Sequence, residues 1–197
     1  MKKTLLKYYF LSLFLTFSIV GASASDKPNG KTPENCSNFV LIQGSSNINR
    51  FEFIHEAPRL VGNEQQSDRL TWQQEVIVPV KEFTGSNQHM RKDFLELLKA
   101  TEYPVIQIDI EPKNEKAITG PVEKRDLNAT ITLAGHTHEY VVPCKISACD
   151  TSEILIKGSL KVNLTDFNIE PPKKVLGTIK VNDEVFITFA FKQETEK

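Results

Sequence analysis

Three histidines are the residues of this chain whose type and spacing could support metal chemistry. His136 and His138 are two positions apart, and His89 lies at the start of a segment with helical periodicity. If the strands form a simple meander, all three fall at the same end of the fold, where converging imidazoles could bind Zn²⁺ or Cu²⁺. The alternative is an exposed helix residue and a solvated hairpin pair, because H-x-H spacing recurs easily and no acidic fourth ligand is identified.

The three cysteines offer a second kind of chemistry. Cys36 precedes the first expected strand, whereas Cys144 and Cys149 lie at the end of a later one. Pairing of Cys36 with Cys149 would tie the N-terminal segment to the domain, and pairing of Cys144 with Cys149 would close a small loop. We expect one disulfide, with Cys36 and Cys149 as the candidate pair. The alternative is three free thiols, with Cys144 a small inward apolar residue.

Motifs for hydrolytic and nucleotide chemistry are absent from the sequence. It contains no G-x-S-x-G, no H-E-x-x-H and no glycine-rich loop that could cradle a phosphate. Asp109 and Asp166 are isolated acids in an expected strand and loop, where such residues more often face solvent or cap turns. The sequence therefore lacks the motifs of these enzyme classes, and no cofactor is predicted.

The N-terminal segment has the composition of a secretory signal peptide. Three lysines within residues 1–7 precede an apolar run over residues 8–20, and residues 22–24 supply an A-x-A cleavage site. Thirteen helical residues span only about 20 Å, which is short of a ~30 Å hydrocarbon core. Stable insertion in a membrane is therefore not expected once the signal is cleaved.

This pattern divides the chain into three parts. We expect a signal peptide over residues 1–24, a flexible leader over 25–36 and a single barrel domain over 37–197, located in the periplasm or secreted. Cleavage of the signal peptide removes three lysines and no acid. The count of Lys and Arg therefore falls from 24 to 21 against 25 acids, and the net charge changes from −1 to −4. An acidic domain of this kind is not a nucleic-acid binder.

From residue 38 onward the dominant hydrophobic period is two. Leu127, Ala129, Ile131 and Leu133, for example, alternate with polar side chains. This alternation predicts half-buried antiparallel strands. We expect a short extra strand over 175–182 and eight main strands, at residues 38–44, 48–56, 71–82, 104–111, 126–134, 136–146, 153–163 and 184–192.

One segment has helical periodicity instead. Met90, Phe94, Leu97 and Leu98 share one face of residues 87–100, with charged residues opposite. Eight antiparallel strands and one amphipathic helix near one end predict an all-β barrel, and a two-sheet sandwich is the alternative.

Several segments agree in order and spacing with a known family. They are GSSNINRF at 44–51, SNQHMRKDF at 86–94 with YPVI at 103–106, residues 127–135 followed by Thr137, and LTDFNI at 164–169. These segments resemble the YceI-like family of exported, lipocalin-like barrels. The resemblance implies a hydrophobic tunnel that holds an isoprenoid or similar amphiphile, and it implies no catalytic residues. The sequence departs from the family pattern in its His136–Glu139 hairpin, its cysteines and its Pro171-Pro172 pair.

The alternating pattern independently predicts an apolar barrel interior. The candidate lining residues are Leu41, Phe51, Phe53, Trp72, Val76, Val78, Ile106, Ile108, Ile131, Leu133, Tyr140, Val142, Ile156, Leu160, Ile187 and Phe189. An eight-stranded barrel can either be filled by such side chains or hold one small ligand. The resemblance favours the second outcome.

The favoured hypothesis is therefore a binding protein whose partner is an isoprenoid, a quinone or a fatty-acid-like amphiphile. A metal-dependent binder or enzyme using His89, His136 and His138 is one alternative, and a filled barrel that acts through protein contacts is another. Self-association into a homodimer is left open.

Overall fold

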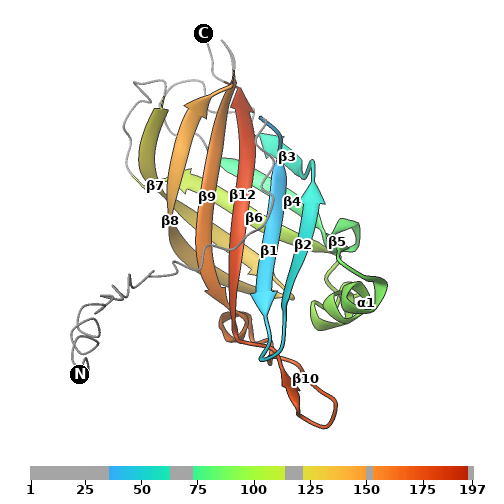
Figure 1. Ribbon diagram of the computed structural model, residues 1–197. Coiled ribbons are helices and arrows are strands. Elements are labelled where there is room, and N and C mark those ends of the chain that lie inside the picture. The colour runs from blue at the N-terminus through green and yellow to red at the C-terminus, as the bar shows by residue number, and fades with distance from the viewer. Residues whose placement is uncertain (1–35, 63–72, 114–121, 150–152, 195–197) are drawn as a thin grey trace, which may run out of the picture.

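The computed structural model describes residues 36–62, 73–113, 122–149 and 153–194, and they form a curled antiparallel sheet with one α-helix (Figure 1). No helix in these ranges is long and apolar enough to cross a membrane. The elements are β1 Phe39–Ser45, β2 Arg50–Glu56, β3 Arg59–Gly62, β4 Gln74–Pro79, η1 Val80–Glu82, β5 Thr84–Gly85, α1 Gln88–Leu97, β6 Val105–Pro112, β7 Val122–Leu133, β8 His136–Ala148, β9 Glu153–Asn163, η2 Leu164–Phe167, β10 Lys173–Lys174, β11 Ile179–Lys180 and β12 Glu184–Glu194.

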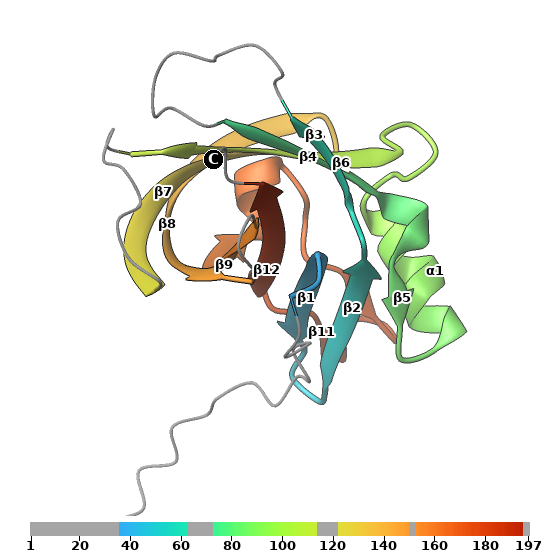
Figure 2. The same cartoon turned by 90° about the horizontal axis from the view of Figure 1, so that it is seen from above.

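The main sheet contains ten strands in the order β3-β4-β6-β7-β8-β9-β12-β1-β2-β5. All neighbours in this order are antiparallel, and the sheet curls round an apolar interior (Figure 2). The tight β7–β8 hairpin turns at Ala134 and Gly135, whose φ angles of 48° and 80° suit a two-residue hairpin loop. An all-β barrel-like fold with one helix is thus confirmed.

The barrel closes through two short ladders. β3 follows β2 after two residues and pairs with β4 over four residues, from Arg59–Ile77 to Gly62–Gln74. β2 pairs with β5 through Phe53–Gly85 and Ile54–Thr84, and β5 follows β4 directly through η1. The order of the predicted meander is therefore kept here, but the 3₁₀ turn leaves a gap without strand pairing between the two ladders. The predicted strand 71–82 correspondingly ends at Pro79 and continues as η1.

Helix α1 covers this gap, as its amphipathic sequence requires (Figure 2). The Asn87 side chain caps its N-terminus by accepting a 2.8 Å hydrogen bond from the backbone N–H of Met90. Phe94 and Leu98 are buried, and Arg91 donates from Nε to the carbonyl of Phe83 at 3.0 Å. The predicted helix is confirmed, and the predicted apolar face is the one that packs on the barrel.

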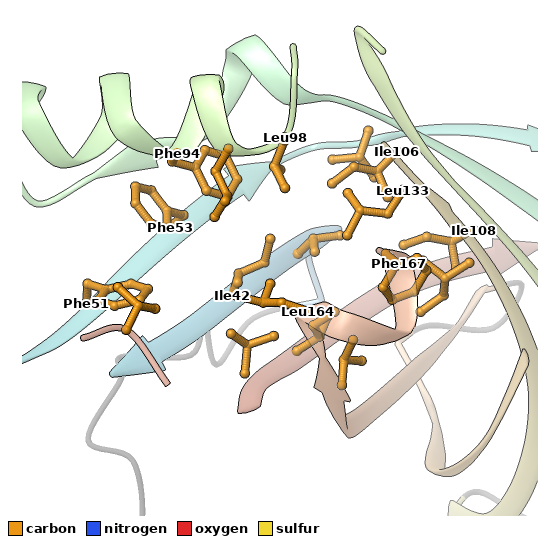
Figure 3. A pocket seen from close by; sticks show the side chains of 18 residues that line it. Ile42, Phe51, Phe53, Phe94, Leu98, Ile106, Ile108, Leu133, Leu164 and Phe167 are labelled. Atoms are coloured by element: carbon orange, nitrogen blue, oxygen red, sulfur yellow. The ribbon is translucent and has the colours of Figure 1, made fainter. Parts of the chain in front are cut away.

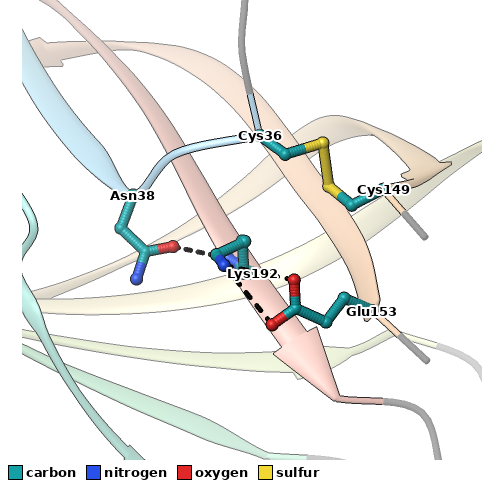
Figure 4. The surroundings of a disulfide bond; sticks show 5 residues. All are labelled: Cys36, Asn38, Cys149, Glu153 and Lys192. Carbon is teal, nitrogen blue, oxygen red and sulfur yellow. Dashed lines mark hydrogen bonds and ion pairs between the residues drawn. A yellow bond between two sulfur atoms is a disulfide. The ribbon is translucent and has the colours of Figure 1, made fainter.

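The disulfide joins Cys36 to Cys149, which settles the pairing that the sequence left open (Figure 4). It lies where the chain enters β1 and leaves β8, and Cys144 is a buried free cysteine. Beside it, Asn38 accepts a 2.7 Å hydrogen bond from the N–H of Lys192, and the Lys192 ammonium contacts the Glu153 carboxylate at 3.1 Å. The N-terminal end of the domain is therefore fixed to the sheet by covalent and polar contacts.

The β10–β11 hairpin replaces the single extra strand expected over 175–182. Its loop is closed by a hydrogen bond from the N–H of Gly177 to the carbonyl of Lys174 at 3.1 Å. Val175 and Leu176, the two central residues of this turn, have φ angles of 52° and 53°. Side chains with a Cβ rarely adopt this left-handed conformation, which costs about 1–2 kcal/mol per residue.

Candidate functional site

An apolar cavity of about 70 Å³ occupies the half of the barrel nearest η2 and α1 (Figure 3). The residues that line it are all apolar, and most come from the barrel strands, with others from α1 and η2. They are Val40, Ile42, Phe51, Phe53, Val78, Phe94, Leu97, Leu98, Ile106, Ile108, Ile131, Leu133, Val162, Leu164, Phe167, Val181, Val185 and Ile187.

The other half of the barrel is filled by side chains. Phe189 and Phe191 stack at 5.1 Å between ring centroids, and the Phe189 ring covers Gly158 so closely that a Cβ there would meet it at 2.5 Å. Val76, Val142 and Ile156 are buried beside them. The interior is therefore part filled core and part cavity, which combines two alternatives that the sequence presents as exclusive.

A wider opening of about 240 Å³, here called the vestibule, lies beside the cavity and opens at the surface. It lies between α1, the β1–β2 turn and the β10–β11 hairpin, and it shares Phe51, Phe53, Phe94, Leu97 and Val181 with the cavity. These five aromatic and aliphatic side chains, here called the neck, therefore separate the vestibule from the cavity.

The rim of the vestibule is polar and connects its three walls. Lys174 of β10 forms a 2.9 Å ion pair with Asp93 of α1. The Asn47 side chain holds the hairpin by donating to the carbonyl of Thr178 and accepting from the N–H of Lys180. An apolar interior with a few charged and amide groups at its mouth is typical of sites for amphiphiles.

The turn at η2 covers the cavity at one end of the barrel. Asn163 and Asp166 form a capping box across the turn, and Leu164 and Phe167 are buried below it. Tyr140 donates from its hydroxyl to the Asp166 carboxylate at 2.9 Å, and burial together with this bond raises the pKa of Tyr140. The Tyr140 hydroxyl therefore stays protonated and donates the hydrogen bond that fixes η2 to β8.

The predicted lining residues fall into three groups in the structure. Those that line the cavity are Phe51, Phe53, Val78, Ile106, Ile108, Ile131, Leu133 and Ile187. Those in the core that do not line it are Val76, Tyr140, Val142, Ile156, Leu160 and Phe189. Trp72 lies outside the described residues, and Leu41 is misplaced.

Leu41 points away from the interior. It packs with Phe39 and Ala190 on the outer face of β1, while its neighbours Val40 and Ile42 line the cavity. The register explains the error, because Leu41 pairs with Ile54, whereas Ile42 pairs with the inward Phe53. A one-residue shift in the choice of face reverses every side chain of a strand.

The sequence interpretation missed lining residues that do not belong to the barrel wall. Phe94, Leu97 and Leu98 come from α1, and Leu164 and Phe167 come from η2. The signal for the helix residues was present, since they form the predicted apolar face. The η2 residues lie in a turn, where no periodicity indicates an inward direction.

The histidines do not assemble into a metal site. Within the ranges that the structure describes, no group of three or more His, Cys, Asp or Glu side chains could hold an ion, so His89, His136 and His138 do not converge. His138 instead lies 4.8 Å from Tyr140 and 6.2 Å from Phe167, between ring centroids. The metal hypothesis is wrong because α1 places His89 on the exposed first turn of the helix.

Cys144 is expected to be inert toward thiol reagents in the folded protein. Burial, with a smaller contribution from Asp126, raises the pKa of its thiol from 9.0 to about 12. A raised folded-state pKa means that the thiol contributes stability below about pH 9, which is lost as the pH rises toward 12. An aromatic disulfide reagent at about pH 8 should label the protein only in denaturant. Rapid labelling of native protein would contradict the buried position, and Cys144→Ala serves as the blank.

The comparisons with known proteins agree with this geometry. A family model described as the YceI-like domain matches residues 39–193. The chain belongs to the YceI-like family. A search of curated proteins gives no match.

Three solved structures show that the YceI-like fold is shared at low sequence identity. A polyisoprenoid binding domain from Saccharophagus degradans has 11% identity and a TM-score of 0.62, over 81% of this chain and 94% of that one. Burkholderia cenocepacia BcnA has 16% identity and a TM-score of 0.59, over 79% and 96%. The Campylobacter jejuni YCEI protein has 14% identity and a TM-score of 0.52, over 87% and 91%.

Proposed function

We propose that this YceI-like protein is an exported, non-enzymatic carrier or scavenger that holds an isoprenoid, a quinone-like molecule or another long-chain lipid in its barrel. The observation that carries the proposal is the cavity lined entirely by apolar side chains, which shares five of its lining residues with an open vestibule. The polyisoprenoid binding domain from Saccharophagus degradans, which shares the fold, supports the choice of ligand class. The disulfide supports export, because such bonds persist in oxidising compartments.

The size of the site restricts how the ligand is held. Ligand pockets usually measure about 300–1,000 Å³, whereas the cavity measures about 70 Å³ and the vestibule about 240 Å³. The first carbons of a chain fit the vestibule, and deeper insertion requires side chains of the neck to change rotamer. Leu97 is placed to do so, since it is only half-buried and borders both spaces.

The affinity should depend on chain length. Each buried methylene contributes about 0.8 kcal/mol, so a series of alcohols of increasing length should bind about fourfold tighter per carbon until the site is full. Ten methylenes contribute on the order of 8 kcal/mol before the costs of ordering, so micromolar affinity, which corresponds to about 8 kcal/mol net, requires a longer chain.

The direct test identifies what the protein carries. Protein purified without detergent from its native compartment is extracted with organic solvent, and the extract is analysed by mass spectrometry. We expect a stoichiometric isoprenoid, quinone or fatty-acid-like amphiphile. An extract without any amphiphile, together with failure of the stripped protein to take up a quinone or prenol, would refute the proposal.

A variant of the neck separates ligand binding from folding. Leu97→Trp should fill the passage between vestibule and cavity and weaken the binding of a long prenol at least tenfold, which corresponds to about 1.4 kcal/mol. The matched control is Leu95→Trp, which is on the same helix and also partly buried but lines neither space. Isothermal titration of both variants checks the prediction, and equal affinities would show that the chain does not pass Leu97.

The assembly state belongs to the same proposal. A monomer already contains the whole cavity and vestibule. We therefore propose that one chain is the binding unit, whether or not it also forms a homodimer.

A further inference from the structure

The tip of the β10–β11 hairpin presents aliphatic side chains to solvent. Leu176 is fully exposed, Val175 is 66% exposed, and Ile48 on the adjoining β1–β2 turn is 63% exposed. Other exposed hydrophobic residues of the described chain, such as Val141 on β8 and Phe186 on β12, lie singly on the barrel wall. Isolated apolar residues are normal on protein surfaces, whereas a group at a projecting tip indicates an interaction site.

The backbone conformation at the tip is one that aliphatic residues rarely adopt. Val175 and Leu176 occupy left-handed φ angles that asparagine or glycine would adopt with less strain. Their side chains contribute no packing that would offset this strain, because they are largely or wholly in solvent. Strain that folding does not explain is characteristic of functional positions.

The tip is flanked by lysines on both strands of the hairpin. The segment from Glu170 to Lys180 contains three lysines and one acid, in a chain whose net charge is −1. Lys173 pairs with Glu170 at 3.3 Å and Lys174 pairs with Asp93 at 2.9 Å, but all four side chains are about half exposed or more. Exposed ion pairs are weak, so these ammonium groups can exchange their carboxylates for lipid phosphates.

The position of the hairpin connects this surface to the ligand site. Lys174, Ile48 and Ile179 line the vestibule, and the hairpin projects beyond the barrel at the same end (Figure 1). Asn47 and the bridge between Ser46 and Val181 fix the hairpin to the β1–β2 turn. A surface that seats on the tip would therefore face the mouth of the apolar site.

We propose that Ile48, Val175 and Leu176, with Lys173, Lys174 and Lys180, form a docking surface for an anionic lipid bilayer. The aliphatic tip inserts among the acyl chains, the lysines contact phosphate groups, and the vestibule opens onto the membrane from which the lipid is taken. This inference rests on the proposed function, and it adds the source of the ligand.

Vesicle flotation tests the proposal with the full mature protein. Wild-type protein should float with vesicles of phosphatidylcholine and phosphatidylglycerol and much less with phosphatidylcholine alone. Leu176→Asp should reduce the bound fraction at least tenfold, the order expected when one leucine no longer leaves water. Val141→Asp is the matched control, because Val141 is also exposed but lies on the barrel wall. It should float like the wild type.

A second variant guards against a folding artefact. V175N/L176G keeps the hairpin, relieves its backbone and removes both aliphatic side chains, so it should fold at least as stably and still fail to float. Binding of farnesol without vesicles is measured in parallel and should be unchanged in every variant. Docking is supported if Leu176→Asp and V175N/L176G no longer float with the vesicles while Val141→Asp still does. This conclusion does not depend on the farnesol result.

The opposite outcomes overturn the proposal. If the wild type does not float, or if the tip variants float equally, the tip does not dock to lipid even where farnesol binds. A partner protein would then be the occupant of the tip. If the wild-type protein does not bind farnesol in the absence of vesicles, that result instead counts against the proposed function.

Discussion

Replacing Phe94 by alanine is expected to lower the free energy of unfolding by about 3–5 kcal/mol and to weaken binding of a prenol, because the lost ring no longer holds α1 as a wall of the site. Phe94 is the buried aromatic residue through which α1 packs on the barrel. Its ring stacks on Phe53 at 4.1 Å and meets the edge of Phe83 at 5.4 Å, both measured between centroids. The same ring lines both the cavity and the vestibule.

Urea denaturation and isothermal titration of the Phe94→Ala variant check the two parts of this prediction. Leu95→Ala is the control, since Leu95 lies on the same helix, is half-buried and lines neither space. We expect a smaller loss of stability there and unchanged binding. A Phe94→Ala protein as stable as the wild type would mean that α1 does not pack as the structure has it.

Removing the disulfide is expected to cost about 2–5 kcal/mol of the free energy of unfolding. Cys36 and Cys149 are 113 residues apart in sequence, and chain-entropy arguments give about 4.7 kcal/mol for a loop of roughly this length. The double variant Cys36→Ser/Cys149→Ser avoids leaving an unpaired partner. Its urea midpoint should fall well below that of the oxidised wild type.

Two controls make the disulfide prediction specific. Wild-type protein treated with a reductant should unfold like the double variant, and the double variant should not respond to the reductant. Cys144→Ala, which leaves the disulfide intact, should retain the response. Identical urea midpoints for oxidised and reduced wild type would contradict a stabilising Cys36–Cys149 bond.

The sequence predicts the wall of the barrel well where one face of a strand is polar. Ile106 and Ile108 alternate with polar residues, and both line the cavity as expected. The run Phe39-Val40-Leu41-Ile42 is apolar on both faces, so its period carries no information about direction. Only its pairing with β2 places Ile42 inside and Leu41 outside.

The extent of the cavity could not be predicted, for a different physical reason. Phe189 and Ile187 are on the same face of β12, yet one fills the interior over Gly158 and the other lines empty space. The difference depends on which neighbours reach across the barrel, and this is a property of packing in three dimensions. A period of two gives the face of a residue but not the depth of free volume in front of it.

The short ladder between β2 and β5 determines where this barrel can change its circumference. The other ladders of the main sheet contain four or more residue pairs, whereas β5 is joined to β2 by two. Moving α1 and β5 outward therefore disrupts few hydrogen bonds and mainly separates apolar contacts such as the one between Phe94 and Phe53. The cavity is too narrow for a long chain as it stands. The contact between β2 and β5 beside it is the part of the described wall that can open with the loss of the fewest backbone hydrogen bonds.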